Sequence, residues 1–118
     1  MKVIIAGSRG IGKLTTAWIV KHIIADKNMT VTEVVSGTAR GVDQGGELYA
    51  SRANIPIKRF PADWDSHGKS AGYIRNKQMA EYADALICLW DGESKGAAHM
   101  FDLATKAKLV IYRLDISK

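Results

Sequence analysis

Short apolar runs alternate with helical patterns along the whole chain, and this alternation restricts the fold more than any other feature. The runs predict strands at residues 2–6, 33–36, 55–60, 85–90 and 109–114. The segments between them predict helices near residues 14–26, 43–53, 72–82 and 97–107. An apolar run without polar alternation is typical of a strand covered on both faces. Because βαβ crossovers are right-handed, this order predicts an α/β fold with helices on both faces of a parallel sheet.

Loops rich in glycine and charge follow each of the first four predicted strands. We call them loop 1 (7–9), loop 2 (36–43), loop 3 (61–76) and loop 4 (91–96). We expect a single Rossmann-like domain over residues 1–118, an open parallel five-stranded sheet with strand order 3-2-1-4-5. Such sheets bind ligands outside the carboxyl ends of their strands, where the strand order reverses. Loops 1 and 4 flank that switch point and are predicted to form the ligand site.

The composition is that of a globular domain with a basic surplus. Of 118 residues, 47% are hydrophobic and 25% are charged, and the formal net charge is +5. This charge suits phosphorylated small molecules and nucleic acids alike. No apolar run approaches the ~20 residues that span a bilayer, and the first run is too short for a signal peptide. We therefore expect a cytoplasmic protein of bacterial or phage origin without a membrane partner.

Cys88 is the only cysteine, which excludes an internal disulfide. It lies within the apolar run 85–90, so a buried and inert thiol is expected. We expect neither a bound metal nor a cofactor.

Loop 1 begins a phosphate-binding motif without completing it. Residues 7–13 satisfy G-x-x-x-x-G-K between a predicted strand and a predicted helix. A Walker A loop next needs Ser or Thr to hold Mg²⁺, and Leu14 occupies that place. We therefore expect Gly7 to allow a tight turn while Ser8 and Arg9 point at a ligand. The alternative is a plain strand-to-helix turn.

Loop 2 carries a stronger signal for an anion. Gly37 and Gly41 bracket Arg40 where a helix begins, and a helix N-terminus with an arginine fork suits a phosphate. Asp43 would repel a phosphate, and two roles stay open for it: accepting from a ribose hydroxyl, or capping the helix. The glycine pair at 45–46 predicts close packing of the helix or the approach of a ligand.

Loop 3 is unusually long and is expected to act as a lid. Trp64 stacks on a base or packs onto the core, and Asp63 lies beside it. Lys69 belongs to a basic, mobile hinge. Arg75 and Asn76 lie in the first turn of the next helix, where a cation is unfavourable. That cost indicates that Arg75 serves a ligand or a carboxylate such as Asp63.

Loop 4 is predicted to be a second phosphate cradle. Gly92 and Gly96 flank Ser94 and Lys95, and small residues open the following helix. Small side chains let an anion reach the backbone N–H groups. His99 lies in the first turn, and an isolated histidine is more often structural than catalytic.

Five segments together resemble the SLOG superfamily of Rossmann-like nucleotide-binding domains, most closely its small stand-alone proteins related to YspA and YpsA. The segments are residues 5–9, 36–43, 60–64, 68–80 and 94–100. The resemblance covers nearly the whole chain. It implies a Rossmann-like sheet that binds a nucleotide or a nucleotide-derived ligand. The superfamily also includes the LOG phosphoribohydrolases and the DNA-processing protein DprA.

The resemblance to LOG enzymes is incomplete at the catalytic loop. Arg75 and Lys77 loosely resemble the Arg-Lys motif of that family, and residues 91–100 resemble its P-G-G-x-G-T-x-x-E loop. Met100 stands where the catalytic Glu is expected, and Ala97 replaces the Thr. N-glycosidic cleavage needs a carboxylate to stabilise positive charge or to activate water. Asp63, Asp91 and Glu93 lack the expected spacing.

We therefore expect a protein that senses or sequesters a nucleotide or nucleotide-derived phosphorylated ligand. The alternatives are a LOG-type phosphoribohydrolase with catalytic candidates Asp63, Arg75, Asp91 and His99, and DprA-like DNA binding, for which aromatic platforms are sparse. A homo-oligomer is left open, and nucleic acid is the less favoured partner. The expected ligand contacts are Gly7, Ser8, Arg9, Gly37, Arg40, Gly41, Asp43, Asp63, Trp64, Lys69, Arg75, Asn76, Gly92, Ser94, Lys95 and Gly96.

Overall fold

Five parallel strands form one sheet in the computed structural model, which describes residues 1–116. The strands are β1 (Lys2–Gly7), β2 (Glu33–Ser36), β3 (Ile57–Arg59), β4 (Ala85–Trp90) and β5 (Val110–Asp115). Their order is β3-β2-β1-β4-β5, which confirms the predicted order 3-2-1-4-5. β1 pairs with β4 from Val3 opposite Ala85 to Gly7 opposite Leu89. The strand order therefore reverses between β1 and β4, as predicted.

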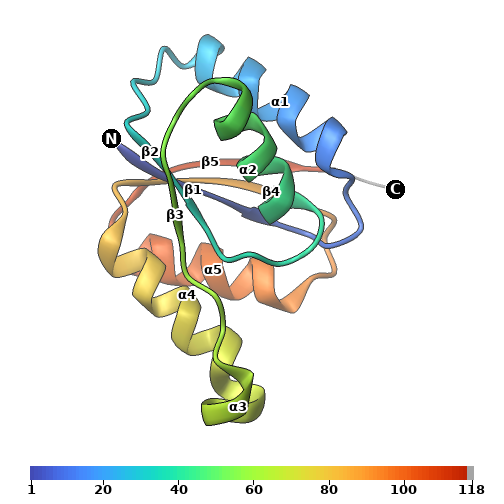
Figure 1. Ribbon diagram of the computed structural model, residues 1–118, viewed down its shortest axis with the longest axis vertical. Coiled ribbons are helices and arrows are strands. Elements are labelled where there is room, and N and C mark those ends of the chain that lie inside the picture. The colour runs from blue at the N-terminus through green and yellow to red at the C-terminus, as the bar shows by residue number, and fades with distance from the viewer. Residues whose placement is uncertain (117–118) are drawn as a thin grey trace.

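Helices cover both faces of this sheet, so the predicted doubly wound architecture is confirmed (Figure 1). α1 (Lys13–Asp26) and α2 (Val42–Arg52) lie on one face. α4 (Ala71–Tyr82) and α5 (Lys95–Lys106) lie on the other. Within residues 1–116, no helix has the length and apolar character needed to cross a membrane.

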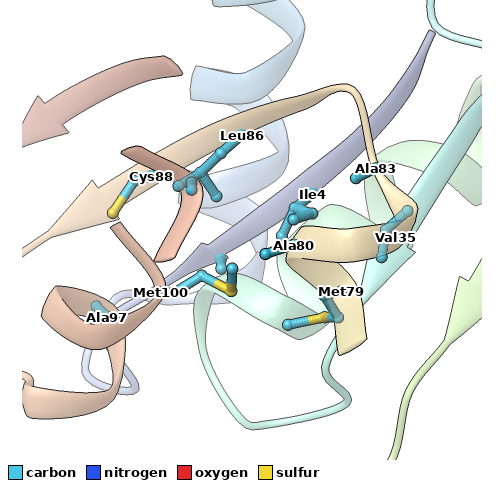
Figure 2. Close-up of a cluster of buried hydrophobic side chains, with 11 residues drawn as sticks. Ile4, Val35, Met79, Ala80, Ala83, Leu86, Cys88, Ala97 and Met100 are labelled. Atoms are coloured by element: carbon cyan, nitrogen blue, oxygen red, sulfur yellow. The ribbon is translucent and has the colours of Figure 1, made fainter. Parts of the chain in front are cut away.

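Each face of the sheet has its own hydrophobic core. Ile4 and Leu86 pack with Met79 and Met100 from α4 and α5, as Figure 2 shows. The strand residues between them face the opposite cluster beneath α1 and α2. This two-sided burial is why β1 is apolar from Val3 onward and β4 is apolar at every position. Cys88 lies within the first cluster as predicted, and burial raises its pKa to about 11, which keeps the thiol protonated and inert.

Loop 3, predicted as one unusually long loop, is largely helical, and its predicted role as a lid stays a prediction. A short helix, α3 (Trp64–His67), and a 3₁₀ turn, η1 (Gly68–Ser70), run directly into α4. The side chain of Asp63 starts α3 by accepting a hydrogen bond from the Ser66 amide at 3.1 Å. Lys69 therefore belongs to a helical turn. β3 is also shorter than the predicted strand at residues 55–60.

The glycine pair in α2 is explained by packing. A Cβ on Gly45 would lie 2.3 Å from the Cβ of Thr16 on α1. A Cβ on Gly46 would lie 2.7 Å from the Cβ of Ile5 in β1. Both glycines let α2 approach its neighbours closely, which is the first of the two predicted reasons for the pair.

Replacing Gly45 with alanine is expected to lower the free energy of unfolding by ~2 kcal/mol. The new Cβ would lie only 2.3 Å from the Thr16 Cβ, so the overpacking cost is expected at the upper end of ~1–3 kcal/mol, and the ~1 kcal/mol that alanine gains in a helix leaves ~2 kcal/mol. Urea denaturation followed by circular dichroism measures the change. Gly96→Ala is the matched control, because no atom within 4 Å would meet the new Cβ. Equal stability of Gly45→Ala and wild type would contradict this explanation of the pair.

Candidate functional site

A cavity of about 290 Å³ opens at the switch point between the carboxyl ends of β1 and β4. We call it the inner cavity. The end of β1, loop 1, loop 4 and three helices enclose it. Its lining residues are Ala6, Gly7, Arg9, Ala39, Asp43, Arg75, Asn76, Met79, Ser94, Lys95, Gly96, Ala97 and Met100. The lining of the inner cavity thus combines apolar alanine and methionine side chains with charged and amide side chains.

Ser8 fastens the loops together beneath this cavity. Its side chain is fully buried, its amide donates to the Leu89 carbonyl at 3.0 Å, and its Oγ accepts from the Asp91 amide at 2.9 Å. Its carbonyl accepts from the Val42 amide at 3.3 Å. Ser8 does not line the inner cavity, in contrast to the orientation predicted for it. It holds loops 1 and 4 and the start of α2 in fixed relation.

Two glycines permit this close meeting of loops. A Cβ on Gly7 would lie 1.9 Å from the Leu89 carbonyl oxygen, so only glycine fits between β1 and β4 there. Gly41 has a φ of 76°, and a Cβ on it would lie 2.6 Å from the Arg9 carbonyl oxygen. The left-handed backbone and the short distance both require glycine. Loops 1 and 2 are therefore packed together as one wall of the site.

Asp43 is buried and binds the backbone of loop 2. Its carboxylate is only 6% exposed and accepts a hydrogen bond from the Ala39 amide at 3.1 Å. Burial raises the pKa of Asp43 to about 6, against the opposing effects of the Ala39 hydrogen bond and of Arg75. Gly41 is the N-cap residue of α2, so the predicted capping role for Asp43 is wrong. Its other predicted role, toward a ribose, stays a prediction.

Arg75 lies against the same loop. Its Nε donates to Asn76 Oδ1 at 2.9 Å, and its Nη1 donates to the Gly37 carbonyl. A Cβ on Gly37 would meet both the Arg75 guanidinium and the Asp43 carboxylate. The carboxylate near Arg75 is therefore Asp43, and the prediction that Asp63 is this carboxylate is wrong.

The inner cavity has more positive than negative charge. Arg9, Arg75 and Lys95 line it, and Asp43 is the one carboxylate among its lining residues. Arg9 and Lys95 form no ion pair within the described part of the chain. Burial lowers the pKa of Arg75, and its like-charged neighbour Arg9 adds to this, while Asp43 opposes both. An anion entering the cavity would relieve this repulsion.

The N-terminus of α5 adds backbone donors to the same wall. Ser94 caps the helix by accepting from the Ala97 amide at 3.3 Å. The Asp91 carboxylate accepts from the amides of Glu93 and Ser94 at 2.9 and 3.0 Å, which fixes loop 4. The first amides of a helix lack intrahelical partners, and the positive end of the helix dipole attracts anions. Lys95 therefore shares its wall with backbone groups suited to a phosphate.

His99 contacts Asn76, which is a lining residue of the inner cavity. Its Nδ1 lies 3.2 Å from the side-chain nitrogen of Asn76, and its ring makes an edge contact with Tyr73. Burial lowers the pKa of His99, so the ring is neutral at pH 7 and can accept from Asn76. His99 does not line the inner cavity. Asn76 is thus held between His99 and Arg75.

A second cavity of about 250 Å³ adjoins the first across Arg9, Ala39 and Arg75, which line both. We call it the outer cavity. Arg40 and Trp64 contribute to its wall. Trp64 is 53% exposed on α3, so the expectation that it packs onto the core is wrong.

Five predicted ligand contacts line neither cavity: Ser8 and Gly41, which pack the loops together, and Asp63, Lys69 and Gly92. Asp63 starts α3, and the hydrogen bonds from Ser66 hold its pKa below the usual range. Lys69 is exposed in η1, and Gly92 forms a turn in loop 4 with a φ of 86°. Two parts of the site were not predicted from the sequence. One is the apolar lining of the inner cavity by Met79 and Met100, and the other is the Thr38–Ala39 segment, where Thr38 has a φ of 66°. Positive φ at a threonine is rare, and no local sequence signal indicates it.

The sheet and its switch-point cavity define a Rossmann-like α/β protein. The chain belongs to the YspA, cpYpsA-related SLOG family, whose model matches residues 1–67. It is 32% identical over 116 residues to the Gene 61 protein of Mycobacterium phage D29, covering 93% of each chain. These findings confirm the predicted family.

The fold is similar to that of DNA processing protein A (DprA) from Streptococcus pneumoniae, with a TM-score of 0.78 and 18% sequence identity. The similarity covers 98% of this chain and 50% of the DprA chain. The present chain thus corresponds to half the length of that protein, and the likeness establishes the Rossmann-like fold.

Proposed function

We propose that this protein binds a nucleotide or nucleotide-derived phosphorylated ligand at the switch point. The observation that carries the proposal is the uncompensated positive charge of Arg9 and Lys95 in a cavity beside the α5 N-terminus. A phosphate there would receive charge-assisted hydrogen bonds from both side chains and further bonds from backbone amides. Arg75 also lines this cavity and would add a third cation near the phosphate.

The rest of the ligand is assigned from the polar and aromatic groups of the two cavities. Asp43 and Asn76 line the inner cavity and can exchange hydrogen bonds with ribose hydroxyls. Trp64 offers a half-exposed indole face in the outer cavity for a base, and Arg40 stands on the same wall. The two cavities adjoin at Arg9, Ala39 and Arg75, so we assign the phosphate to the inner cavity and the base of the same ligand to the outer one.

Binding without cleavage is favoured by the floor of the inner cavity. Met100 and Met79 are apolar lining residues, and Met100 occupies the place where the LOG motif carries its Glu. If cleavage does occur, Asp43 is the candidate acid or base, because it is the one carboxylate that lines either cavity among the described residues. Release of free base from AMP, lost in Asp43→Asn, would replace binding by hydrolysis in this proposal.

Thermal unfolding with AMP, ADP, NAD and ADP-ribose tests the proposal. A ligand at 100 times its dissociation constant stabilises the native state by ~2.7 kcal/mol, which raises Tm by several degrees. We expect stabilisation by at least one of the four compounds and its loss in the Arg9→Ala/Lys95→Ala double variant.

The control is Lys77→Ala, an exposed cation on α4 that lines neither cavity. It should leave the stabilisation intact. The proposal fails if none of the four compounds raises Tm. Binding of single-stranded DNA with a steep salt dependence, together with no response to nucleotides, would favour DNA binding in its place.

A further inference from the structure

α1 presents large apolar side chains to solvent on the side of the sheet that α1 and α2 cover. Leu14 and Trp18 are each more than 60% exposed, and Leu114 of the neighbouring edge strand β5 is 42% exposed. None of these residues lines the inner or the outer cavity. Contiguous apolar patches of this kind typically mark interaction surfaces. The helices α1 and α2 form the outer layer on this side of the sheet (Figure 1).

Trp18 forms a ridge with a hollow on each side. The larger hollow, about 460 Å³, lies between α1 and α2, with Leu14, Tyr49 and Ala53 among its lining residues. The other, about 410 Å³, lies between α1 and Leu114. His22 braces the ridge, because its ring lies 4.1 Å from the indole and its Nδ1 lies 2.7 Å from the Trp18 carbonyl oxygen. His22 therefore packs against the exposed Trp18 side chain and limits its motion.

The larger hollow has cationic side chains at its edge that can interact with the face of an indole ring. Lys21 and Arg52 line that hollow, and no carboxylate does among the residues described. The face of an indole is the best aromatic acceptor for a cation. Tryptophan and arginine are also the residues most enriched at the energetic centres of interfaces. The hollow is thus suited to receive a tryptophan like the one next to it.

We propose that this face binds a second copy of the chain about a two-fold axis. Each Trp18 would enter the α1–α2 hollow of the other copy, between Lys21 and Arg52. A two-fold interface uses the same patch on both subunits, so that patch must carry both the ridge and its matching hollow. This patch carries both. No lining residue of the two hollows lines either cavity of the ligand site.

The available surface is large enough for a stable dimer. A standard interface buries roughly 800 Å² on each partner, about an eighth of the 6639 Å² that this protein exposes. The 14 residues of α1 extend for about 21 Å. With α2 and β5 on either side, spaced about 10 Å apart, the face provides an area of that order.

Sedimentation equilibrium on the purified chain, over about 1 to 100 µM, tests this proposal. We expect a reversible dimer, and we expect Trp18→Glu to raise its dissociation constant at least ~30-fold. Trp64→Glu is the matched control, since it places the same charge at the other half-exposed tryptophan and should leave the dimer unchanged. Circular dichroism confirms that each variant is folded.

Crosslinking provides an independent readout that leaves Trp18 in place. Cys88 is buried, so Lys21→Cys carries a single accessible thiol. A short bis-maleimide should link two copies of Lys21→Cys much faster than two copies of Lys77→Cys, whose thiol lies on the opposite face of the sheet. A monomeric wild type over the whole range would overturn the proposal. A dimer unaffected by Trp18→Glu, or equal crosslinking of both cysteine variants, would overturn it as well.

Discussion

Asp43→Asn is expected to stabilise the protein at neutral pH by up to about 3 kcal/mol, the largest stability change that the structure implies. Burial raises the Asp43 pKa from 3.8 to about 6, and each unit corresponds to ~1.4 kcal/mol. The ionised carboxylate is therefore costly in the folded state. The asparagine oxygen can still accept from the Ala39 amide, so loop 2 keeps its hydrogen bond.

The raised pKa of Asp43 also determines how the stability of the protein changes with pH. Between about pH 4 and 6 the folded protein binds more protons at Asp43 than the unfolded chain does. This contribution to stability is therefore present at low pH, is lost as pH rises to about 6, and stays lost above it. Urea denaturation of both proteins from pH 4 to 8 measures the difference. A wild type that gains stability relative to Asp43→Asn over this range would contradict the assignment.

A buried carboxylate that costs stability indicates a function for Asp43. Stability is commonly lost at sites that hold a charge for a ligand. We expect Asp43→Asn to keep phosphate binding, because the substitution removes a negative charge from the inner cavity. A ligand that uses the carboxylate for its ribose should lose affinity by roughly tenfold, the effect of one charged hydrogen bond.

Replacing Arg75 with alanine is expected to weaken ligand binding by at least tenfold and to destabilise the protein by ~2 kcal/mol at pH 7. The substitution removes a cation from both cavities and leaves the Gly37 carbonyl and Asp43 without their guanidinium neighbour. Titration calorimetry with the ligand found by thermal unfolding measures the first effect. Urea denaturation measures the second.

The destabilisation in Arg75→Ala should shrink at pH 5. Protonated Asp43 no longer needs a cation, so the penalty for removing Arg75 falls as pH drops below about 6. Arg40→Ala is the control, since Arg40 is exposed and lines only the outer cavity. It should leave stability unchanged at both pH values. A penalty in Arg75→Ala that does not depend on pH would disprove the coupling to Asp43.

The fold could be predicted because its signals are local. Continuous apolar runs identify β1 and β4, and turns that contain glycine separate β1, β2 and β4 from the helices that follow them. The position of the cavity followed from the strand order, since the switch point of an open sheet is fixed by topology. Arg9, Arg75 and Lys95 were also found this way, because parallel strands end at the same edge.

Side-chain roles were harder to predict because the deciding partners are distant in sequence. Ser8 looks like a ligand donor until the Asp91 amide, 83 residues away, is found to donate to its hydroxyl. Arg75 has an acidic neighbour, but loop 2 brings Asp43 to it while Asp63 is engaged with Ser66. The helical character of loop 3 did have a local signal, since Asp63 stands three residues before the amide that it caps.

A titration of the ¹⁵N-labelled protein with whichever of AMP, ADP, NAD and ADP-ribose raises Tm most, followed by backbone amide NMR shifts, tests the central claim most directly. Binding at the switch point predicts saturable shifts at Arg9, Ala39, Lys95 and Gly96, which line the inner cavity. The same shifts should be absent in the Arg9→Ala/Lys95→Ala variant. If that nucleotide moves no amide in the inner cavity, or moves only amides around Trp18, the switch-point cavity is not the nucleotide site.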